Sequence, residues 1–247
     1  MDDSYCIASL ATIVESGHDD KGQYLIFDQT IAYPGGGGQP MDNITLSKQN
    51  KNIAEVNKCN FNNGRIKYYV DQLPTKIEEG DEIAMHIDRK SRIQNSAYHT
   101  AGHWIASIVT ENLLLPLIPL KGFHFSTGAY VEFDGSLEDL PADLLYQIEY
   151  AMRIDQQAQL KIKAHVVSVA DFHAQRTEIS VAKNFQPMTD RPLRLVQFDN
   201  YKAVPCGGTH LSSVSELKSL TPTKVKMKNG KIRISYSMEV PAMILPS

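Results

Sequence analysis

The chain has 247 residues, of which 42% are apolar and 21% charged, and this composition is that of a globular protein rather than a disordered one. The 25 Lys and Arg are balanced by 28 Asp and Glu, so the formal net charge of −3 excludes a broadly basic nucleic-acid coat but not a local basic patch. No apolar run approaches ~18 residues, so we expect no membrane span. The start lacks basic and apolar signal regions, and three cysteines are too few for a disulfide framework, which favours a cytoplasmic protein.

The first 88 residues carry signals of β-structure. Two short runs rich in β-forming residues occur at Tyr24–Phe27 and Lys67–Val70. Residues 82–88 alternate between polar and apolar side chains, which is typical of a strand with one buried face. Several short strands with turn residues between them predict a small barrel or sandwich.

The hydrophobic period changes after Asp88. Apolar residues then recur every three or four positions, which predicts an amphipathic helix. Its stripe consists of Ile93, Ala97, Ala101, Trp104 and Ile108. This change of period places a domain boundary between residues 1–88 and residues 89–247.

Helices and strands are mixed in the second part. A second helix is expected to open near Asp139, with Pro141 close to its first turn. Strands are expected at residues 162–169 and 193–198. A hairpin over residues 224–236 is expected to turn at Asn229-Gly230, since this dipeptide tolerates positive φ. The fold class predicted for the chain is α+β.

Four residues have the spacing of metal ligands. His99 and His103 stand at i and i+4 of the predicted helix, on one face and roughly opposite the apolar stripe, where they can face a cleft. Cys206 and His210 flank a Gly-Gly-Thr segment in which the backbone can turn tightly. Three imidazoles and one thiol suit a single Zn²⁺ per chain.

Two alternatives stay open for these residues. Histidines at i and i+4 are commonly a solvated helix face, and Cys206 alone would be a small buried apolar residue. A closed set of four ligands is normally structural, whereas a catalytic zinc usually keeps one position for water.

A glycine-rich segment precedes the predicted helix. Gly35–Gly38 are four consecutive glycines bracketed by prolines, so they form neither a helix nor a strand interior. Their backbone N–H groups can approach a ligand closely, although the segment is neither a P-loop nor a dinucleotide fingerprint. Thr30, Tyr33 and Gln39 frame the glycines with hydrogen-bonding side chains, which weighs against a flexible surface loop.

Three segments together resemble a known family. Residues 30–40 (TIAYPGGGGQP), 99–103 (HTAGH) and 206–210 (CGGTH) occur in the order found in the editing domain of alanyl-tRNA synthetase. The chain resembles the free-standing relatives of that domain, the AlaX-type trans-editing hydrolases, over about residues 20–240. It departs from the common motif in its fourth glycine, Gly35, and in Gly102, where the synthetase version often has Thr.

The resemblance implies a fold and an activity. It implies an N-terminal β-barrel with the glycine-rich loop at residues 1–88 and a zinc-binding α/β editing domain at residues 89–247. The zinc ligands would be His99, His103, Cys206 and His210. The reaction would be hydrolysis of the ester that joins a wrong amino acid, serine or glycine, to the acceptor end of tRNA(Ala). No synthetase adenylation domain is expected.

The residues expected to contact substrate lie in the glycine-rich loop. Rejection of alanine requires a group that hydrogen-bonds the seryl hydroxyl, because polar groups left unpaired by alanine are costly. Thr30 is the first candidate for this catalytic-site contact and Gln39 the second. The substrate-binding set is Thr30, Tyr33, Gly36, Gly37, Gly38 and Gln39.

Two basic clusters could contact tRNA phosphates. One precedes the histidine helix and comprises Arg89, Lys90 and Arg92, and the other comprises Lys218, Lys224, Lys226, Lys228, Lys231 and Arg233. An edge strand protected by lysines is an equally good interpretation of the second. The alternative functions are a non-catalytic zinc-stabilised RNA-binding module and a threonyl-tRNA editing hydrolase. The sequence does not specify the oligomeric state.

Overall fold

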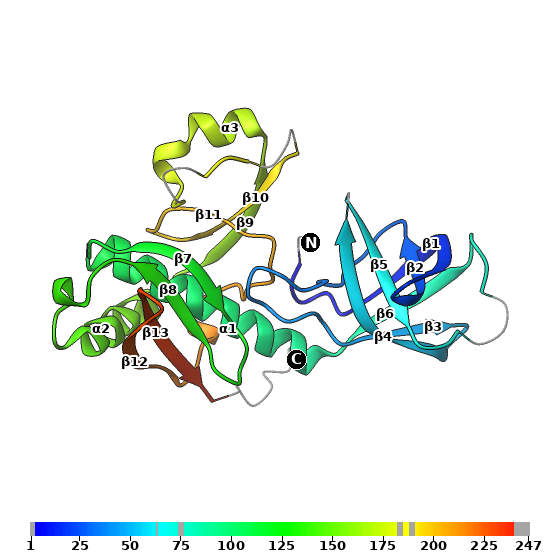
Figure 1. Ribbon diagram of the computed structural model, residues 1–247, viewed down its shortest axis with the longest axis horizontal. Helices are drawn as coiled ribbons and strands as arrows, with labels where there is room; N and C mark the ends of the chain where they lie inside the picture. Colours follow the sequence, from blue (N-terminus) through cyan, green and yellow to red (C-terminus); the bar gives the residue numbers. More distant parts are fainter. Residues whose placement is uncertain (1–2, 63, 74–76, 182–184, 188–190, 240–247) are drawn as a thin grey trace. The chain divides into compact units, whose positions relative to one another are not determined.

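The chain folds into two compact units that interleave in sequence. The computed structural model describes residues 3–62, 64–73, 77–181, 185–187 and 191–239. The first unit holds residues 3–36 and 40–93, and the second holds residues 37–39 and those from Gln94 onward (Figure 1). The end of the glycine-rich loop therefore belongs to the second unit. The division into functional domains at residues 1–88 and 89–247 stays a prediction.

The first unit is a closed barrel, which agrees with the small barrel expected for this part of the chain. Its strands follow one another around the barrel in the order β1-β2-β5-β4-β3-β6, and every neighbouring pair is antiparallel. The strands are β1 (Ala8–Asp19), β2 (Gly22–Phe27), β3 (Ile44–Lys48), β4 (Lys51–Asn62), β5 (Arg65–Val70) and β6 (Glu82–Ile87).

Closure depends on the two longest strands. β1 and β4 have 12 residues each, and each pairs with two neighbours. The register of β1 shifts between Ile13 and Glu15, and that of β4 shifts between Val56 and Lys58. Such irregularities bend a strand and increase its twist, which allows a small sheet to close on itself without free edges.

The period-two pattern of β6 gives the barrel part of its core. Ile83, Met85 and Ile87 point inward and are at most 5% exposed, whereas Glu82 and His86 are exposed. The inward side chains join a cluster that includes Leu25 and Leu46. Full burial of each large apolar side chain is worth about 1.5–3 kcal/mol, so this alternation fixes which face of the strand lies inside.

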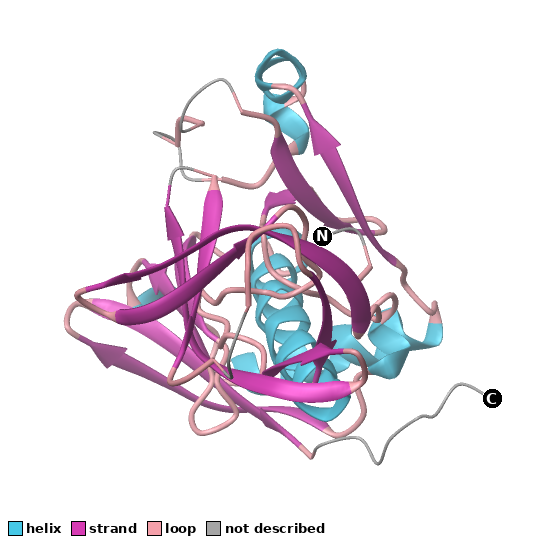
Figure 2. Ribbon diagram, turned by 90° about the vertical axis from the view of Figure 1, so that its right-hand side faces the viewer, coloured by secondary structure: helices cyan, strands magenta, loops and turns pink. Residues whose placement is uncertain are grey.

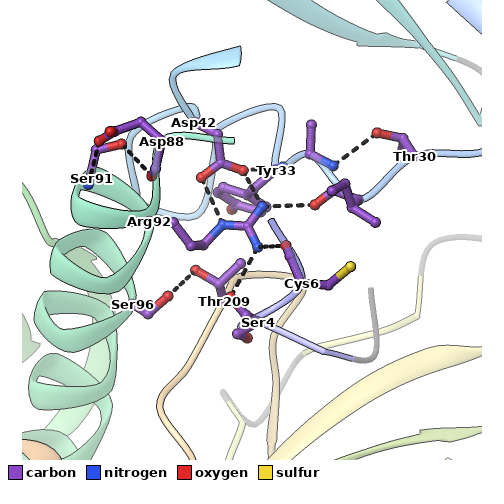
Figure 3. A network of polar contacts seen from close by, with 12 residues as sticks. Ser4, Cys6, Thr30, Tyr33, Asp42, Asp88, Ser91, Arg92, Ser96 and Thr209 are labelled. Atoms are coloured by element: carbon purple, nitrogen blue, oxygen red, sulfur yellow. Dashed lines mark hydrogen bonds and ion pairs between the residues drawn. The ribbon is translucent and has the colours of Figure 1, made fainter. Parts of the chain in front are cut away.

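A buried ion pair organises the loops of the first unit. Arg92 is wholly buried, and its Nε and Nη2 donate to the two carboxylate oxygens of Asp42 at 2.9 and 2.5 Å (Figure 3). Arg92 also donates to the carbonyl oxygens of Ser4 and Ile31, and Asp42 accepts the backbone N–H of Tyr33 at 2.6 Å. The expectation that Arg92 contacts phosphates is therefore wrong, because its donors are committed inside the protein.

The second unit contains two antiparallel sheets and the helices apart from the first turn of α1, and helices are few beside the strands (Figure 2). One sheet has the order β12-β13-β8-β7 and the other β11-β10-β9. The strands are β7 (Ile118–Phe123), β8 (Tyr130–Asp134), β9 (Ile162–Val167), β10 (Leu193–Phe198), β11 (Val204–Pro205), β12 (Leu220–Lys228) and β13 (Lys231–Met238). The α-helices are α1 (Arg89–Ser107), α2 (Leu144–Gln157) and α3 (Val169–Ala174). Single turns of other helix types are η1 (Ile108–Asn112), η2 (Leu137–Asp139), η3 (Arg176–Glu178) and η4 (Val214–Glu216).

Helix α1 forms where the apolar period predicts it, but it is buried on more than one face. Ala97, Ala101, Trp104 and Ile108 are wholly buried, as expected for the stripe. His99, on the face expected to line a cleft, is also 1% exposed. The reason is that segments distant in the sequence cover this face. None of the helices in the described ranges is long and apolar enough to cross a membrane.

The other predicted elements of this unit are present with small shifts. Helix α2 begins at Leu144, beyond Pro141, and the expected start near Asp139 is a separate turn, η2. β9 ends at Val167, because the next residue, Ser168, caps α3 by accepting the N–H of Asp171. The hairpin turns at Asn229-Gly230, whose φ angles are 51° and 70°.

Candidate metal centre

The structure brings the four predicted metal ligands together. His99 and His103 project from α1, and Cys206 and His210 come from the loop after β11. All four ligand atoms lie within 4.8 Å of one another. His99 Nε2 is 3.2 Å from His103 Nε2 and 3.6 Å from Cys206 Sγ, which is itself 3.3 Å from His210 Nε2. This cluster could hold a metal ion.

Gln39 fixes the protonation of His99. Gln39 Oε1 accepts the backbone N–H of Thr209 at 3.0 Å, which identifies this atom as the amide oxygen. The same oxygen lies 2.6 Å from His99 Nδ1, so Nδ1 carries the proton and donates it. Nε2 of His99 is therefore a lone-pair donor toward the centre, as a metal ligand requires.

Thr209 and Ser96 hold Gln39 in place. Gln39 Nε2 donates to Thr209 Oγ1 at 2.8 Å, and Ser96 Oγ donates to the same oxygen at 2.7 Å. Gln39, Ser96 and Thr209 are at most 2% exposed. The amide of Gln39 is thus part of a buried network that orients the His99 ring, which is a role that sequence reasoning did not give it.

The loop that carries Cys206 is folded around its sulfur atom. Gly208 N donates to Cys206 Sγ at 3.3 Å, and Arg194 Nη1 donates to the carbonyl oxygens of Cys206 and Gly208 at 2.9 Å each. A Cβ atom at Gly208 would overlap the ring of His99. Only glycine therefore lets this loop approach α1 closely enough to complete the cluster.

A second side chain of α1 contacts His210, the last of the four predicted ligands. Thr100 Oγ1 lies 3.2 Å from His210 Nδ1 and accepts the backbone N–H of Leu211 at 3.0 Å. Each of the two histidines from buried positions, His99 and His210, thus has its Nδ1 engaged by a neighbouring side chain. This leaves Nε2 of each ring facing the centre.

The electrostatics of the cluster keep its imidazoles neutral. Burial, reinforced by the neighbouring His210 and His103, holds the pKa of His99 well below its usual value. Burial likewise lowers the pKa of His103 to about 4. Burial raises the pKa of the Cys206 thiol, although the Gly208 N–H and Arg194 act in the opposite direction. A bound cation would offset the cost of deprotonating this sulfur.

The glycine-rich loop has a backbone that other residues rarely adopt. Gly35, Gly36, Gly37 and Gly38 have φ angles of 88°, 118°, 52° and 83°. In the first unit, Tyr33 Oη donates to the carbonyl oxygen of Gly36 at 2.8 Å. In the second unit, a Cβ at Gly38 would overlap the carbonyl oxygen of Gly122. The consecutive glycines are thus required by the path of the chain.

Thr30 lies in the first unit, and its hydroxyl bonds within that unit. Thr30 Oγ1 accepts from Tyr68 Oη at 2.6 Å and from Ala32 N at 2.9 Å, and it donates to Met85 Sδ at 3.3 Å. Tyr68 is 1% exposed, so Thr30 satisfies a buried phenol of the barrel. The contact of Thr30 with substrate stays a prediction.

Sequence reasoning missed a further histidine beside this cluster. His124 follows β7, is 3% exposed and stacks on the ring of His99 with a centroid distance of 4.6 Å. Burial, with a smaller effect of His103, lowers its pKa to about 3. No spacing links His124 to the other histidines. The sequence feature connected with His124 is Gly102, a glycine in the interior of the predicted helix. In the structure a Cβ at this position would overlap the His124 ring.

The hairpin at the end of the described chain has one uncompensated basic edge. Arg233 and Lys231 of β13 form ion pairs with Glu132 and Asp134 of β8. The exposed lysines of β12 have no ion-pair partner in the described residues. They are Lys224, Lys226 and Lys228. β12 is at the edge of its sheet, so this row of charge is open to solvent.

Comparison with known proteins gives several relatives, although no protein-family model matches. The chain is 26% identical over 235 residues to an alanyl-tRNA editing protein, AlaX-M, of Methanosarcina barkeri, with 90% of each protein covered. It is 25% identical over 230 residues to AlaX-L of Pyrococcus horikoshii, covering 92% of this chain and 54% of that protein. It is 28% identical over 242 residues to an alanine–tRNA ligase of Thermoplasma acidophilum, covering 91% of this chain and 25% of the ligase.

These similarities extend along nine-tenths of the chain. They include both units and the segments that carry the cluster, and the chain spans nearly the full length of AlaX-M but only a quarter of the ligase. The predicted resemblance to the AlaX-type alanyl-tRNA editing proteins is confirmed.

Proposed function

We propose that the protein is a zinc-dependent trans-editing hydrolase that removes serine or glycine from wrongly charged tRNA(Ala). The observation that carries the proposal is the three-nitrogen, one-sulfur cluster with its orienting amide, in a chain similar to AlaX-M over 90% of its length. The proposal assigns tRNA(Ala) as substrate and an ester bond as the bond that is cleaved.

The donor set supports zinc as the metal. Tetrahedral Zn²⁺, with bonds of about 2.0–2.1 Å to nitrogen and about 2.3 Å to sulfur, separates two nitrogens by about 3.3 Å and a nitrogen from sulfur by about 3.6 Å. The corresponding separations here are 3.2 Å for His99 to His103, and 3.6 and 3.3 Å for Cys206 to His99 and His210. His99, His103, Cys206 and His210 would hold the ion.

When bound, zinc supplies a positive charge that can polarise an ester carbonyl or lower the pKa of a water molecule. The chain's own residues provide orientation. Gln39 holds His99 in the tautomer that leaves Nε2 free. Burial keeps His99 and His103 neutral, so that they are ready to ligate without losing a proton first.

The glycine-rich loop would supply the contacts to the aminoacyl group. With φ positive at Gly36, Gly37 and Gly38, the backbone N–H groups can approach an anionic or carbonyl oxygen without obstruction from side chains. Thr30 and Tyr33 would contribute hydroxyls, and a contact of Thr30 with the seryl hydroxyl would favour seryl over alanyl esters.

The basic edge of β12 would contact the phosphate backbone near the acceptor end. Its lysines lie exposed on one strand, and none of them has a carboxylate partner among the described residues. Since their charge is not neutralised, each can replace a condensed counterion of the nucleic acid.

Deacylation assays test the proposal. Purified protein is incubated with seryl-, glycyl- and alanyl-tRNA(Ala), with and without a chelator. We expect loss of serine or glycine, retention of alanine, and arrest by the chelator that zinc reverses. Binding of tRNA without deacylation would instead establish a zinc-stabilised RNA-binding module. Activity confined to seryl-tRNA(Thr) would establish threonyl-tRNA editing.

A further inference from the structure

His124 occupies a slot in the second unit that only glycines can line. A Cβ at Gly102 of α1 or at Gly122 of β7 would overlap the His124 ring, and the backbone N–H of His124 donates to the carbonyl oxygen of Gly38 at 2.8 Å. Glycine inside a helix costs about 1 kcal/mol relative to alanine. The glycine at position 102 therefore makes α1 less stable than alanine would, but it leaves the space in which the His124 ring lies beside His99.

A hydrogen-bond chain determines which nitrogen of His124 is protonated. Tyr236 Oη donates its only proton to the carbonyl oxygen of Tyr98 at 2.8 Å. The same oxygen lies 2.6 Å from His124 Nδ1, so it accepts there and Nδ1 is the protonated nitrogen. Nε2 of His124 is consequently an acceptor with a free lone pair.

This lone pair has no hydrogen-bond partner in the described part of the chain. The polar side-chain atoms there that are both fully sealed from solvent and unpartnered are Ser9 Oγ, Glu111 Oε1 and Arg194 Nε. His124 Nε2 is not among them, so it is not fully sealed, although the residue as a whole is only 3% exposed. A buried, fixed acceptor beside a metal cluster is suited to receive a donor group of a ligand.

We propose that His124 is a specificity-determining residue whose Nε2 accepts a hydrogen bond from an O–H or N–H donor of the bound aminoacyl group. The inference rests on the proposed editing function. The ester carbonyl is excluded as the partner, because it is itself an acceptor. The two donors that remain in the aminoacyl group are the hydroxyl of serine and the α-ammonium that serine and glycine share.

Two variants separate the role of the Nε2 atom from that of the hydrogen bond between Nδ1 and Tyr236. His124→Asn keeps an amide that can donate to Tyr236 Oη but has no atom at the Nε2 position. His124→Gln reaches the Nε2 position with an acceptor oxygen. Both are compared with the wild-type protein for kcat/KM on seryl- and glycyl-tRNA(Ala), with zinc content and thermal unfolding measured in parallel.

We expect the Asn variant to bind zinc normally and to lose activity, and the Gln variant to recover part of it. A loss of about three- to tenfold on the seryl substrate alone identifies the hydroxyl, and an equal loss of about tenfold to a hundredfold on both substrates identifies the charged ammonium. Wild-type kcat/KM on both substrates in the Asn variant overturns the inference.

A measurement on the unmodified protein avoids any folding defect of the variants. The ¹⁵N resonance of His124 Nε2 is followed in the zinc-loaded protein as 3′-(L-seryl)amido-3′-deoxyadenosine, a stable analogue of the ester, or its glycyl counterpart is added. A shift from the range of an unprotonated nitrogen toward that of a hydrogen-bonded one supports the inference, and no shift under saturation overturns it. Absence of deacylation by the wild-type protein would instead defeat the proposed function.

Discussion

At the scale of single residues, the geometry of the cluster depends on side chains outside its four candidate ligands. Gln39 sets the tautomer of His99 through one oxygen that accepts two donors. Tyr236 sets that of His124 through one oxygen that both donates and accepts. In both cases the hydrogen bonds of a neighbouring side chain determine which nitrogen of the imidazole carries the proton.

Replacing Gln39 tests its hold on His99. Gln39→Met keeps the volume of the side chain but removes the acceptor, so we expect zinc affinity to fall by about tenfold to a hundredfold, as for other partners of metal-bound histidine. Competition with a chromophoric chelator measures it. Gln39→Glu is the matched control, because it retains an oxygen for His99 Nδ1 and Thr209 N. Equal affinity of the Met variant and the wild type would contradict the assignment.

Replacing Thr30 tests both its bonds in the barrel and its predicted contact with substrate. Thr30→Val leaves the buried phenol of Tyr68 without an acceptor, so we expect the free energy of unfolding to fall by about 1–3 kcal/mol. Chemical denaturation measures it, and Thr30→Ser should retain most of the stability.

The substrate contact is measured separately. If Thr30 also bonds the seryl hydroxyl, the ratio of kcat/KM for seryl- over glycyl-tRNA(Ala) should fall about threefold to tenfold in the Val variant. An equal loss on both substrates would instead place Thr30 in general catalysis or in folding of the loop, and no loss on either would assign it to the barrel alone.

At the scale of elements, one side of α1 packs into the core and its other side carries the histidines of the cluster. Its fully buried stripe includes Trp104, whose Nε1 donates to Asp155 of α2 at 2.7 Å, and Tyr201 donates to the same carboxylate oxygen. The histidines on its other side are covered by Gln39 and by the loop of Cys206. Because other elements pack against the helix on several sides, the surrounding side chains have little room to rearrange when a side chain of α1 changes in volume.

Gly102→Ala tests this tight packing. Alanine favours a helix, but its Cβ would overlap the His124 ring and the Tyr236 hydroxyl, so we expect a net loss of stability in thermal unfolding. Gly207→Ala is the control, since it has an open surrounding and should be neutral. The double variant Gly102→Ala/His124→Ala should regain stability relative to Gly102→Ala. A single variant as stable as the wild type would contradict the geometry.

The edge strand β12 gives a second test at this scale. We expect the triple Lys→Gln variant at residues 224, 226 and 228 to raise KM for tRNA. The slope of log KM against log salt concentration should also decrease by about 0.7–0.9 for each phosphate that the variant no longer neutralises. Lys163→Gln on β9 is the control, because Lys163 is exposed and paired with Asp199. An unchanged salt dependence would leave these lysines the protective role of edge-strand charges.

At the scale of the whole molecule, the buried histidines link stability to pH. In the folded chain burial lowers the pKa of His103 to about 4 and of His124 to about 3, whereas an unfolded histidine titrates near ~6.5. Between these values the unfolded chain binds protons that the folded chain does not. The free energy of unfolding therefore falls as pH falls through this window, by up to about 1.4 kcal/mol per pH unit for each histidine, and levels off below the folded pKa.

Urea unfolding of the metal-free protein between pH 7.5 and 4.5 checks this expectation. Zinc should increase stability at pH 7.5 and lose this effect on acidification, because protonated imidazoles do not ligate. In the His103→Gln variant the unfolded chain should bind one proton fewer, so the free energy of unfolding should depend less steeply on pH. A flat profile would contradict the burial of neutral histidines.

The sequence by itself determined the local features. The alternation in β6, the apolar period of α1 and the Asn229-Gly230 turn follow from rules that act over a few residues, and the structure has them where they were expected. The ligand pairs His99/His103 and Cys206/His210 are local in the same way, because each needs one turn of helix or one tight loop.

Only the tertiary structure decided what surrounds those ligands. Gln39 meets His99 across 60 residues, His124 meets Tyr236 across 112, and Arg92 meets Asp42 across 50. No periodicity connects such positions, since the contacts arise when the closed barrel and the sheets bring distant segments together. Burial and hydrogen-bond partners fix protonation and charge, so the tautomers of His99 and His124 and the withdrawal of Arg92 from solvent became evident only in the folded chain.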